Sequence, residues 1–139
     1  MTADEVAALI IDRASRFGEH NPQQLQYLSG RLRTIEEGTV ARGLLSLFTD
    51  GPAPPEGSAA QELAGRMLAL LRPRTDIDLH QLLPAALGRY ELSVEQFPHY
   101  LGWAFGVEQV LAELELLTHA PLSPDEERAV QTMRFWLRT

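Results

Sequence analysis

The sequence of 139 residues contains no cysteine, and all twelve of its basic residues are arginine. The absence of cysteine excludes a disulfide scaffold, thiol catalysis, a zinc finger and an iron–sulfur cluster. Long apolar runs are also missing, since none approaches the ~20 residues that a membrane span requires. The first residues include Asp4 and Glu5, where a signal peptide would carry basic residues. We therefore expect a cytoplasmic protein with no membrane partner.

Positive charge is scarce. Nineteen acidic residues against twelve arginines give a net charge of −7, and the arginines do not cluster along the chain. A protein of this charge repels nucleic acid, so we expect no nucleic-acid partner. The hydrophobic content of 45% is sufficient for a packed core in a chain of this length. The composition thus indicates a single folded domain over residues 1–139.

Catalytic signatures are absent as well. The sequence has no nucleophile elbow, no glycine-rich phosphate loop and no HExxH motif. The carboxylate pairs Glu36–Glu37 and Glu113–Glu115 are one or two residues apart, and such neighbours do not face each other on a helix. The Asp-Ile-Asp-Leu-His run that ends at His80 would need further ligands from elsewhere to hold a metal. We therefore expect no catalytic residues, no metal and no cofactor.

Helix start and stop signals recur along the whole chain. Thr2 with Glu5 forms a capping box, Asn21 precedes a proline at the first helical position, and Ser123 is followed by proline and three acids. Apolar residues follow these starts at spacings of three and four, and no stretch alternates long enough for a strand. The pattern predicts an all-α fold of about seven helices, at residues 2–18, 22–38, 39–49, 58–72, 78–90, 93–117 and 123–137.

Short connections between these segments favour antiparallel hairpins. The one longer connection is a Pro/Gly loop at residues 50–57. The helices can therefore assemble as a compact bundle or as a short HEAT-like stack of helical pairs. The likeness to such stacks is architectural only, because no family motif is present.

The segment 93–117 has aromatic residues on its polar side. At 100° per residue, Phe97 and Leu101 share the apolar face, whereas Trp103 points away from it with Tyr100 close by. Glu95 and His99 fill the same outer arc. One interpretation is a central helix packed on both sides, which the small residues Gly102 and Gly106 favour. The other is a partner-binding patch, for which exposed Trp and Tyr are the preferred anchors.

Acidic residues surround this segment. Eight occur from Tyr90 to Glu127, a stretch without arginine. Some of them stabilise helix starts, but the rest leave the C-terminal half negative. Such a surface speeds the approach of a basic protein. The hypothetical partner-binding surface consists of Glu91, Glu95, His99, Tyr100, Trp103, Glu108 and Glu115.

The leading hypothesis is a non-enzymatic helical protein that binds a basic protein through this acidic, aromatic C-terminal surface. An example would be a bacterial immunity protein or antitoxin that neutralises a basic toxin. Self-association could bury the same patch. Two alternatives remain open, namely an enzyme that uses Glu95 and His99, and a helical bundle that encloses a small apolar ligand near Phe97, Trp103, Phe105 and Trp136. A cavity would favour the ligand, and an exposed patch would favour a protein partner.

Overall fold

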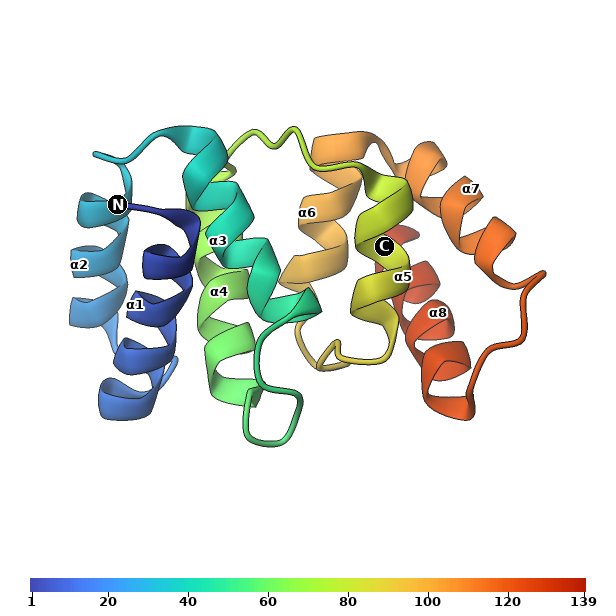
Figure 1. Ribbon diagram of the computed structural model, residues 1–139, viewed down its shortest axis with the longest axis horizontal. Coiled ribbons are helices and arrows are strands. Elements are labelled where there is room, and N and C mark those ends of the chain that lie inside the picture. Colours follow the sequence, from blue (N-terminus) through green and yellow to red (C-terminus); the bar gives the residue numbers. More distant parts are fainter.

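The computed structural model describes all 139 residues, and its secondary structure consists of helices alone. The predicted all-α class is confirmed. The predicted number of seven helices is wrong, because the chain forms eight. They are α1 (Ala3–Phe17), α2 (Pro22–Leu32), α3 (Glu37–Thr49), α4 (Ser58–Leu71), α5 (Leu79–Leu87), α6 (Gln96–Phe105), α7 (Val107–Leu117) and α8 (Pro124–Leu137), as Figure 1 shows.

The additional helix arises because Gly106 divides the segment predicted as one helix at residues 93–117. Gly106 has φ 91° and ψ 134°, a conformation that residues with a Cβ rarely adopt. Its N–H still donates to the carbonyl of Gly102 at 3.0 Å, and its own carbonyl accepts from Val110 at 3.1 Å. One residue therefore ends α6 and begins α7, so these two helices meet at a corner without the loop of a hairpin.

The strongest predicted helix starts are confirmed. The Thr2–Glu5 and Ser123–Glu126 capping boxes are both complete, and Asn21 accepts hydrogen bonds from two amides at the start of α2. Ser58, the first residue of α4, does not cap its helix. Its hydroxyl donates to Glu91 at 2.7 Å and makes no capping bond to α4. A tertiary partner that is 33 residues away has replaced the local one.

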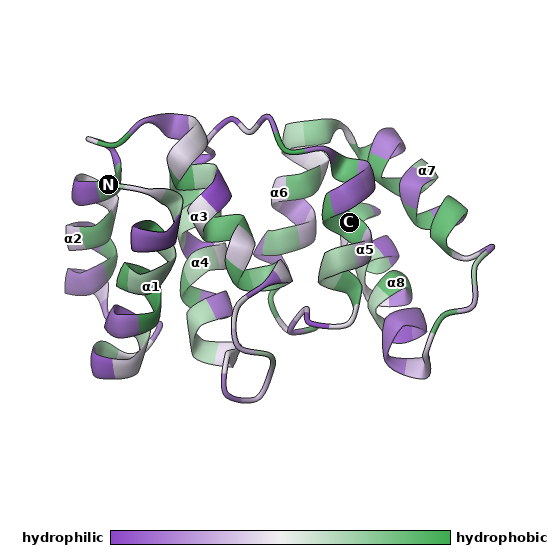
Figure 2. Cartoon of the chain, viewed as in Figure 1, coloured by the Kyte–Doolittle hydropathy of each residue, from purple (hydrophilic) through white to green (hydrophobic).

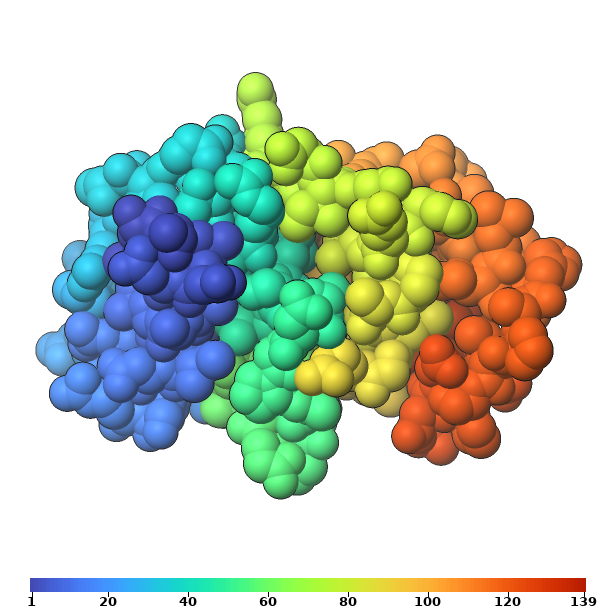
Figure 3. All heavy atoms as spheres, viewed as in Figure 1, coloured from blue at the N-terminus to red at the C-terminus, as the bar shows by residue number.

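The helices form two layers (Figure 1). The odd-numbered helices pack in the order α1, α3, α5, α7, and the even-numbered helices pack beside them in the order α2, α4, α6, α8. The even-numbered helices all run upward in this view. The loop at residues 50–57, between α3 and α4, projects from the lower edge, as Figures 1 and 3 show.

A single hydrophobic cluster of 31 buried residues runs through both layers and draws on every helix. Phe48 of α3 and Phe97 of α6 stack at its centre, with ring centroids 4.2 Å apart. Figure 2 shows hydrophobic residues on all eight helices and mainly hydrophilic residues in the connections. None of the helices combines the length and the apolar character that crossing a bilayer requires.

Candidate partner-binding surface

Trp103 lies on the outer face of α6, where 45% of its surface is exposed. The guanidinium of Arg72, the residue that follows α4, lies 5.7 Å from the centre of the indole ring. A cation over an aromatic face is attracted by the ring quadrupole, so this contact orients the indole without covering it. The sequence placed Trp103 on the outer side of its helix, and the structure agrees.

Tyr100 is not an exposed anchor, and the prediction that paired it with Trp103 at the surface is wrong. Only 3% of its surface is exposed, and its hydroxyl donates to the carbonyl of Pro73. Burial raises the pKa of Tyr100, with a smaller contribution from the negative charge of Glu37. The segment after α4 covers the side of α6 that carries Tyr100. A periodicity argument from α6 alone has no access to that packing.

The predicted acidic residues do not form one cluster. Glu91 is half-buried and accepts hydrogen bonds from Ser58 and Ser93, so it belongs to the junction between α4 and α6. Glu95 is half-buried at the start of α6. Glu108 and Glu115 are exposed on α7.

Glu115 is held by neighbouring basic groups. Its carboxylate lies 2.8 Å from the guanidinium of Arg134 on α8 and 3.7 Å from the imidazole of His119. Glu108 has no ion-pair partner and stands in the first turn of α7, where a negative charge stabilises the helix. Of the predicted acids, Glu108 therefore carries the charge that is freest to meet a partner.

His99 is exposed and contacts α8. Its Nε2 donates to the carbonyl of Trp136 at 3.1 Å, and the two rings lie edge to face with centroids 5.8 Å apart. Glu95 and His99 share only a backbone hydrogen bond, from the N–H of His99 to the carbonyl of Glu95 at 3.2 Å. Their side chains thus lack the contact through which one would activate the other in general acid–base catalysis.

Sequence reasoning did not assign Phe135 to the surface site. It is 59% exposed on α8, and its ring lies edge to face against Trp136 at 5.0 Å. The sequence could have predicted this exposure. Met133 and Leu137 define the buried side of α8, and residue 135 lies on the opposite side of the helix. Together with α6, this helix presents a set of rings, in which His99, Trp136 and Phe135 contact one another in turn and Trp103 lies one helical turn after His99. We call it the aromatic stripe, and it consists of Trp103, His99, Trp136 and Phe135.

The four aromatic residues considered for a small apolar ligand do not surround one cavity. Phe97 is fully buried against Phe48, whereas Trp103 is exposed on the outer face of the same helix. The hollow with the most room is a groove of about 310 Å³ at the ends of α2 and α4, and it is open to solvent. No group of three or more histidine and carboxylate side chains is placed to hold a metal ion.

The arrangement therefore offers exposed aromatic area with few groups placed for chemistry. Comparison with known proteins adds no further constraint, since no family model, no curated protein and no solved structure matches this chain.

Proposed function

We propose that this chain is a non-enzymatic helical protein that binds another protein through the aromatic stripe. The observation that carries the proposal is the exposure of Trp103 (45%) and Phe135 (59%) on the neighbouring helices α6 and α8. Large exposed aromatic side chains are the residues that most often dominate the affinity of protein interfaces. Trp136 contacts both Phe135 and His99 edge to face, and His99 precedes Trp103 by one turn of α6.

The partner in this proposal is basic. Residues 91–139 contain eight acidic residues and three arginines, a net charge of −5. In its most concrete form, the chain is a bacterial, cytoplasmic immunity protein or antitoxin that covers a basic toxin. The exposed carboxylate of Glu108 on α7 would face the partner at one side of the stripe. The two-layer order of the helices supports a HEAT-like stack, a fold that offers extended surfaces to partners.

The test is a differential capture experiment. The wild-type chain, a Trp103→Ser/Phe135→Ser variant and a Leu116→Ser control each serve as bait in a lysate. Leu116 is a matched control because it is 58% exposed, on α7 and outside the stripe. We expect a basic protein that is retained by the wild type and the control and lost by the stripe variant.

The captured protein is then purified, and its affinity for the three baits is measured by calorimetry. A captured protein that binds the stripe variant as tightly as the wild type would contradict the proposal. If the captured protein is a second copy of this chain, the stripe serves self-association and the toxin form of the proposal is wrong.

A further inference from the structure

An apolar groove lies at the upper edge of the molecule, where α2 ends, α3 begins and α4 ends. Its volume is about 310 Å³, and five of its eight lining residues are hydrophobic, while Arg33 and Glu37 contribute polar surface. Leu70 stands at its rim with 54% of its surface exposed, although leucine is usually buried. The lining residues are Leu32, Arg33, Ile35, Glu37, Val40, Leu70, Leu71 and Pro73.

Arginines without a carboxylate partner border this groove. Arg33 lines it, and Arg72 lies between two lining residues; both are exposed and neither forms an ion pair. Arg72 rests against the ring of Trp103. The planar guanidinium group matches the two oxygens of a carboxylate. In a protein with a net charge of −7, these arginines make the groove locally attractive to acidic groups.

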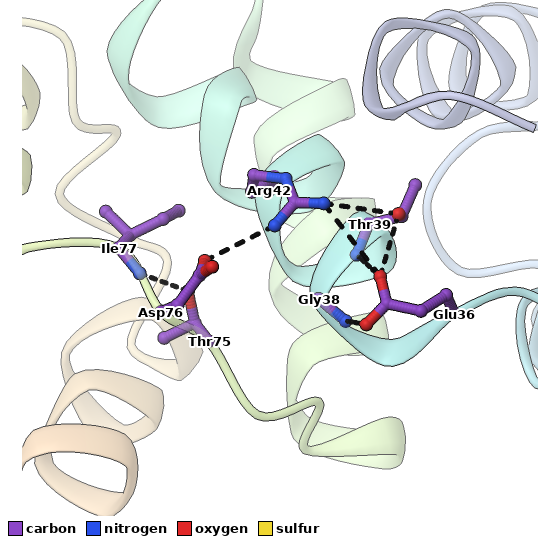
Figure 4. Close-up of polar contacts among 7 residues, drawn as sticks. All are labelled: Glu36, Gly38, Thr39, Arg42, Thr75, Asp76 and Ile77. Atoms are coloured by element: carbon purple, nitrogen blue, oxygen red, sulfur yellow. Dashed lines mark hydrogen bonds and ion pairs between the residues drawn. The ribbon is translucent and has the colours of Figure 1, made fainter.

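The acidic residues beside the groove are engaged within the molecule. Figure 4 shows that Arg42 pairs with Asp76 at 3.3 Å and lies 3.9 Å from Glu36. Glu36 also caps α3 and accepts hydrogen bonds from the amides of Gly38 and Thr39, which lower its pKa. Arg42 thus offsets part of the negative charge beside the groove, whereas Glu37, which lines the groove, forms no ion pair.

Two further hydrogen bonds hold the walls of the groove in place. Glu37 at the rim accepts a hydrogen bond from the backbone N–H of Arg74 at 2.7 Å. Pro73, which forms one wall, accepts a hydrogen bond from the buried Tyr100. The segment after α4 is thus fastened to both α3 and α6. A groove that is formed in advance loses little conformational entropy when a ligand enters it.

We propose that this groove binds an acidic segment of a partner protein, with an apolar side chain of that segment in the groove and its carboxylates on Arg33 and Arg72. The inference goes beyond the proposed function, because it concerns the groove at the ends of α2 and α4 and a ligand of opposite charge, although Arg72 also contacts Trp103 of the stripe. A nucleic acid fits less well. Its phosphates would suit the arginines, but the leucine, isoleucine and valine side chains of the groove offer no stacking platform for a base.

The test uses a short synthetic peptide that carries leucine and glutamate, with calorimetry as the readout. A second peptide has lysine in place of each glutamate, and a single-stranded oligonucleotide is the third probe. We expect the glutamate peptide to bind and the other two not to bind. Arg33→Glu and Leu70→Ser should each weaken its affinity by roughly tenfold or more, the size expected for a lost charged or apolar anchor.

Matched controls come from the same chain. Arg128→Glu alters an exposed arginine near the start of α8, and Leu116→Ser alters a similarly exposed leucine on α7. Both should bind the glutamate peptide like the wild type. Absence of glutamate-peptide binding would overturn the proposal, as would equal binding of the lysine peptide or an unchanged affinity in the two groove variants.

Preferential binding of the oligonucleotide would overturn the proposal in favour of a nucleic-acid surface. The outcome is separable from the proposed function. The single Phe135→Ser variant weakens the stripe but leaves every lining residue of the groove and the Trp103 ring beside Arg72 in place, so it should bind the glutamate peptide like the wild type.

Discussion

Tyr100 and Trp103 lie three residues apart on α6, and their surroundings are opposite. Tyr100 is enclosed between α6 and the segment after α4, whereas nearly half of Trp103 faces solvent. A step of three residues turns the side chain by 300°, which is 60° short of a full circle. That difference is enough to move an aromatic ring from the packed side of a helix to its open side.

This contrast predicts different losses of stability. Tyr100→Ala should lower the free energy of unfolding by ~3 kcal/mol or more, because it leaves a cavity and an unpaired carbonyl on Pro73. Trp103→Ala should lower it by less than half as much, because its ring is only partly covered. Urea unfolding followed by circular dichroism measures both. Equal losses would mean that Trp103 is packed in the core.

The caps show which residue environments a sequence can predict. Thr2, Asn21 and Ser123 bond to amides two or three residues away, so the local pattern was sufficient. Ser58 and Tyr100 bond to groups 33 and 27 residues away. The orientation of such side chains depends on which helices become neighbours, and periodicity within one helix carries no information about that.

At the scale of elements, glycine sets how closely two helices approach. A Cβ added to Gly43 of α3 would lie 2.6 Å from the Cβ of Val6 on α1. Gly43→Ala should therefore lower the free energy of unfolding by roughly 1–3 kcal/mol, although alanine favours helix. The matched control is Gly30→Ala in α2, where a Cβ would meet no atom within 4 Å.

The control should raise the free energy of unfolding by roughly 0.5–1 kcal/mol through helix propensity alone. Thermal or urea melts of the two variants provide the comparison. A Gly43→Ala variant as stable as Gly30→Ala would show that α1 and α3 are farther apart than described here.

The contact between α5 and α7 should respond to pH. The carboxylate of Glu113 lies 3.1 Å from Nδ1 of His80 and raises the pKa of that histidine, with a smaller contribution from Asp78. A raised pKa in the folded state stabilises the fold fully below the ordinary value of 6.5. This contribution is lost as the pH rises through the raised pKa.

The expected result is a free energy of unfolding that falls as the pH rises above the ordinary histidine pKa of 6.5, with a flatter profile in Glu113→Gln. Urea unfolding at several pH values measures the slope. The other histidines contribute equally to both proteins, so the difference between the profiles isolates this contact. Identical profiles would rule out the contact between His80 and Glu113 as their source.

The break between α6 and α7 at Gly106 shows a helix boundary that the sequence pattern could not predict. The sequence correctly indicated helix on both sides of this residue, but a single glycine within a helical pattern is compatible with continuity or with a break. The close approach of α6 and α8 at Gly102, where an added Cβ would lie 3.2 Å from Leu137, agrees with the interpretation that small residues here admit a neighbouring helix. Both features depend on where the rest of the chain packs.

At the scale of the whole molecule, the charge is distributed unevenly. Seven of the twelve arginines form no ion pair, and those at the ends of α2, α4 and α8 suit the negative end of a helix dipole. The sequence places a net charge of −5 in residues 91–139. It could not predict that Glu91 is half-buried or that Glu115 is paired.

Charge reversal tests whether the acidic half attracts the proposed basic partner. Glu108→Arg should slow association with that partner several-fold and change dissociation less. Asp4→Arg is the matched control, since both acids stand in the first turn of a helix and α1 and α7 lie at opposite ends of the row in Figure 1. Stopped-flow kinetics at low and high salt give both rates. Equal association rates for the two variants would exclude steering by α7.

The helices at the two ends of the layers bury fewer residues than the helices in the middle. α2 buries three residues and α7 buries two, whereas α3 and α4 bury seven each. Backbone amides of α2 and α7 should therefore exchange their hydrogens with solvent through local opening, at lower free energy than those of α3 and α4. A protein bound on α8 would suppress local opening of the neighbouring α7. The amides of α2, at the opposite end of the molecule, would still exchange. The pattern of hydrogen-exchange protection would thus reveal which end of the molecule is occupied.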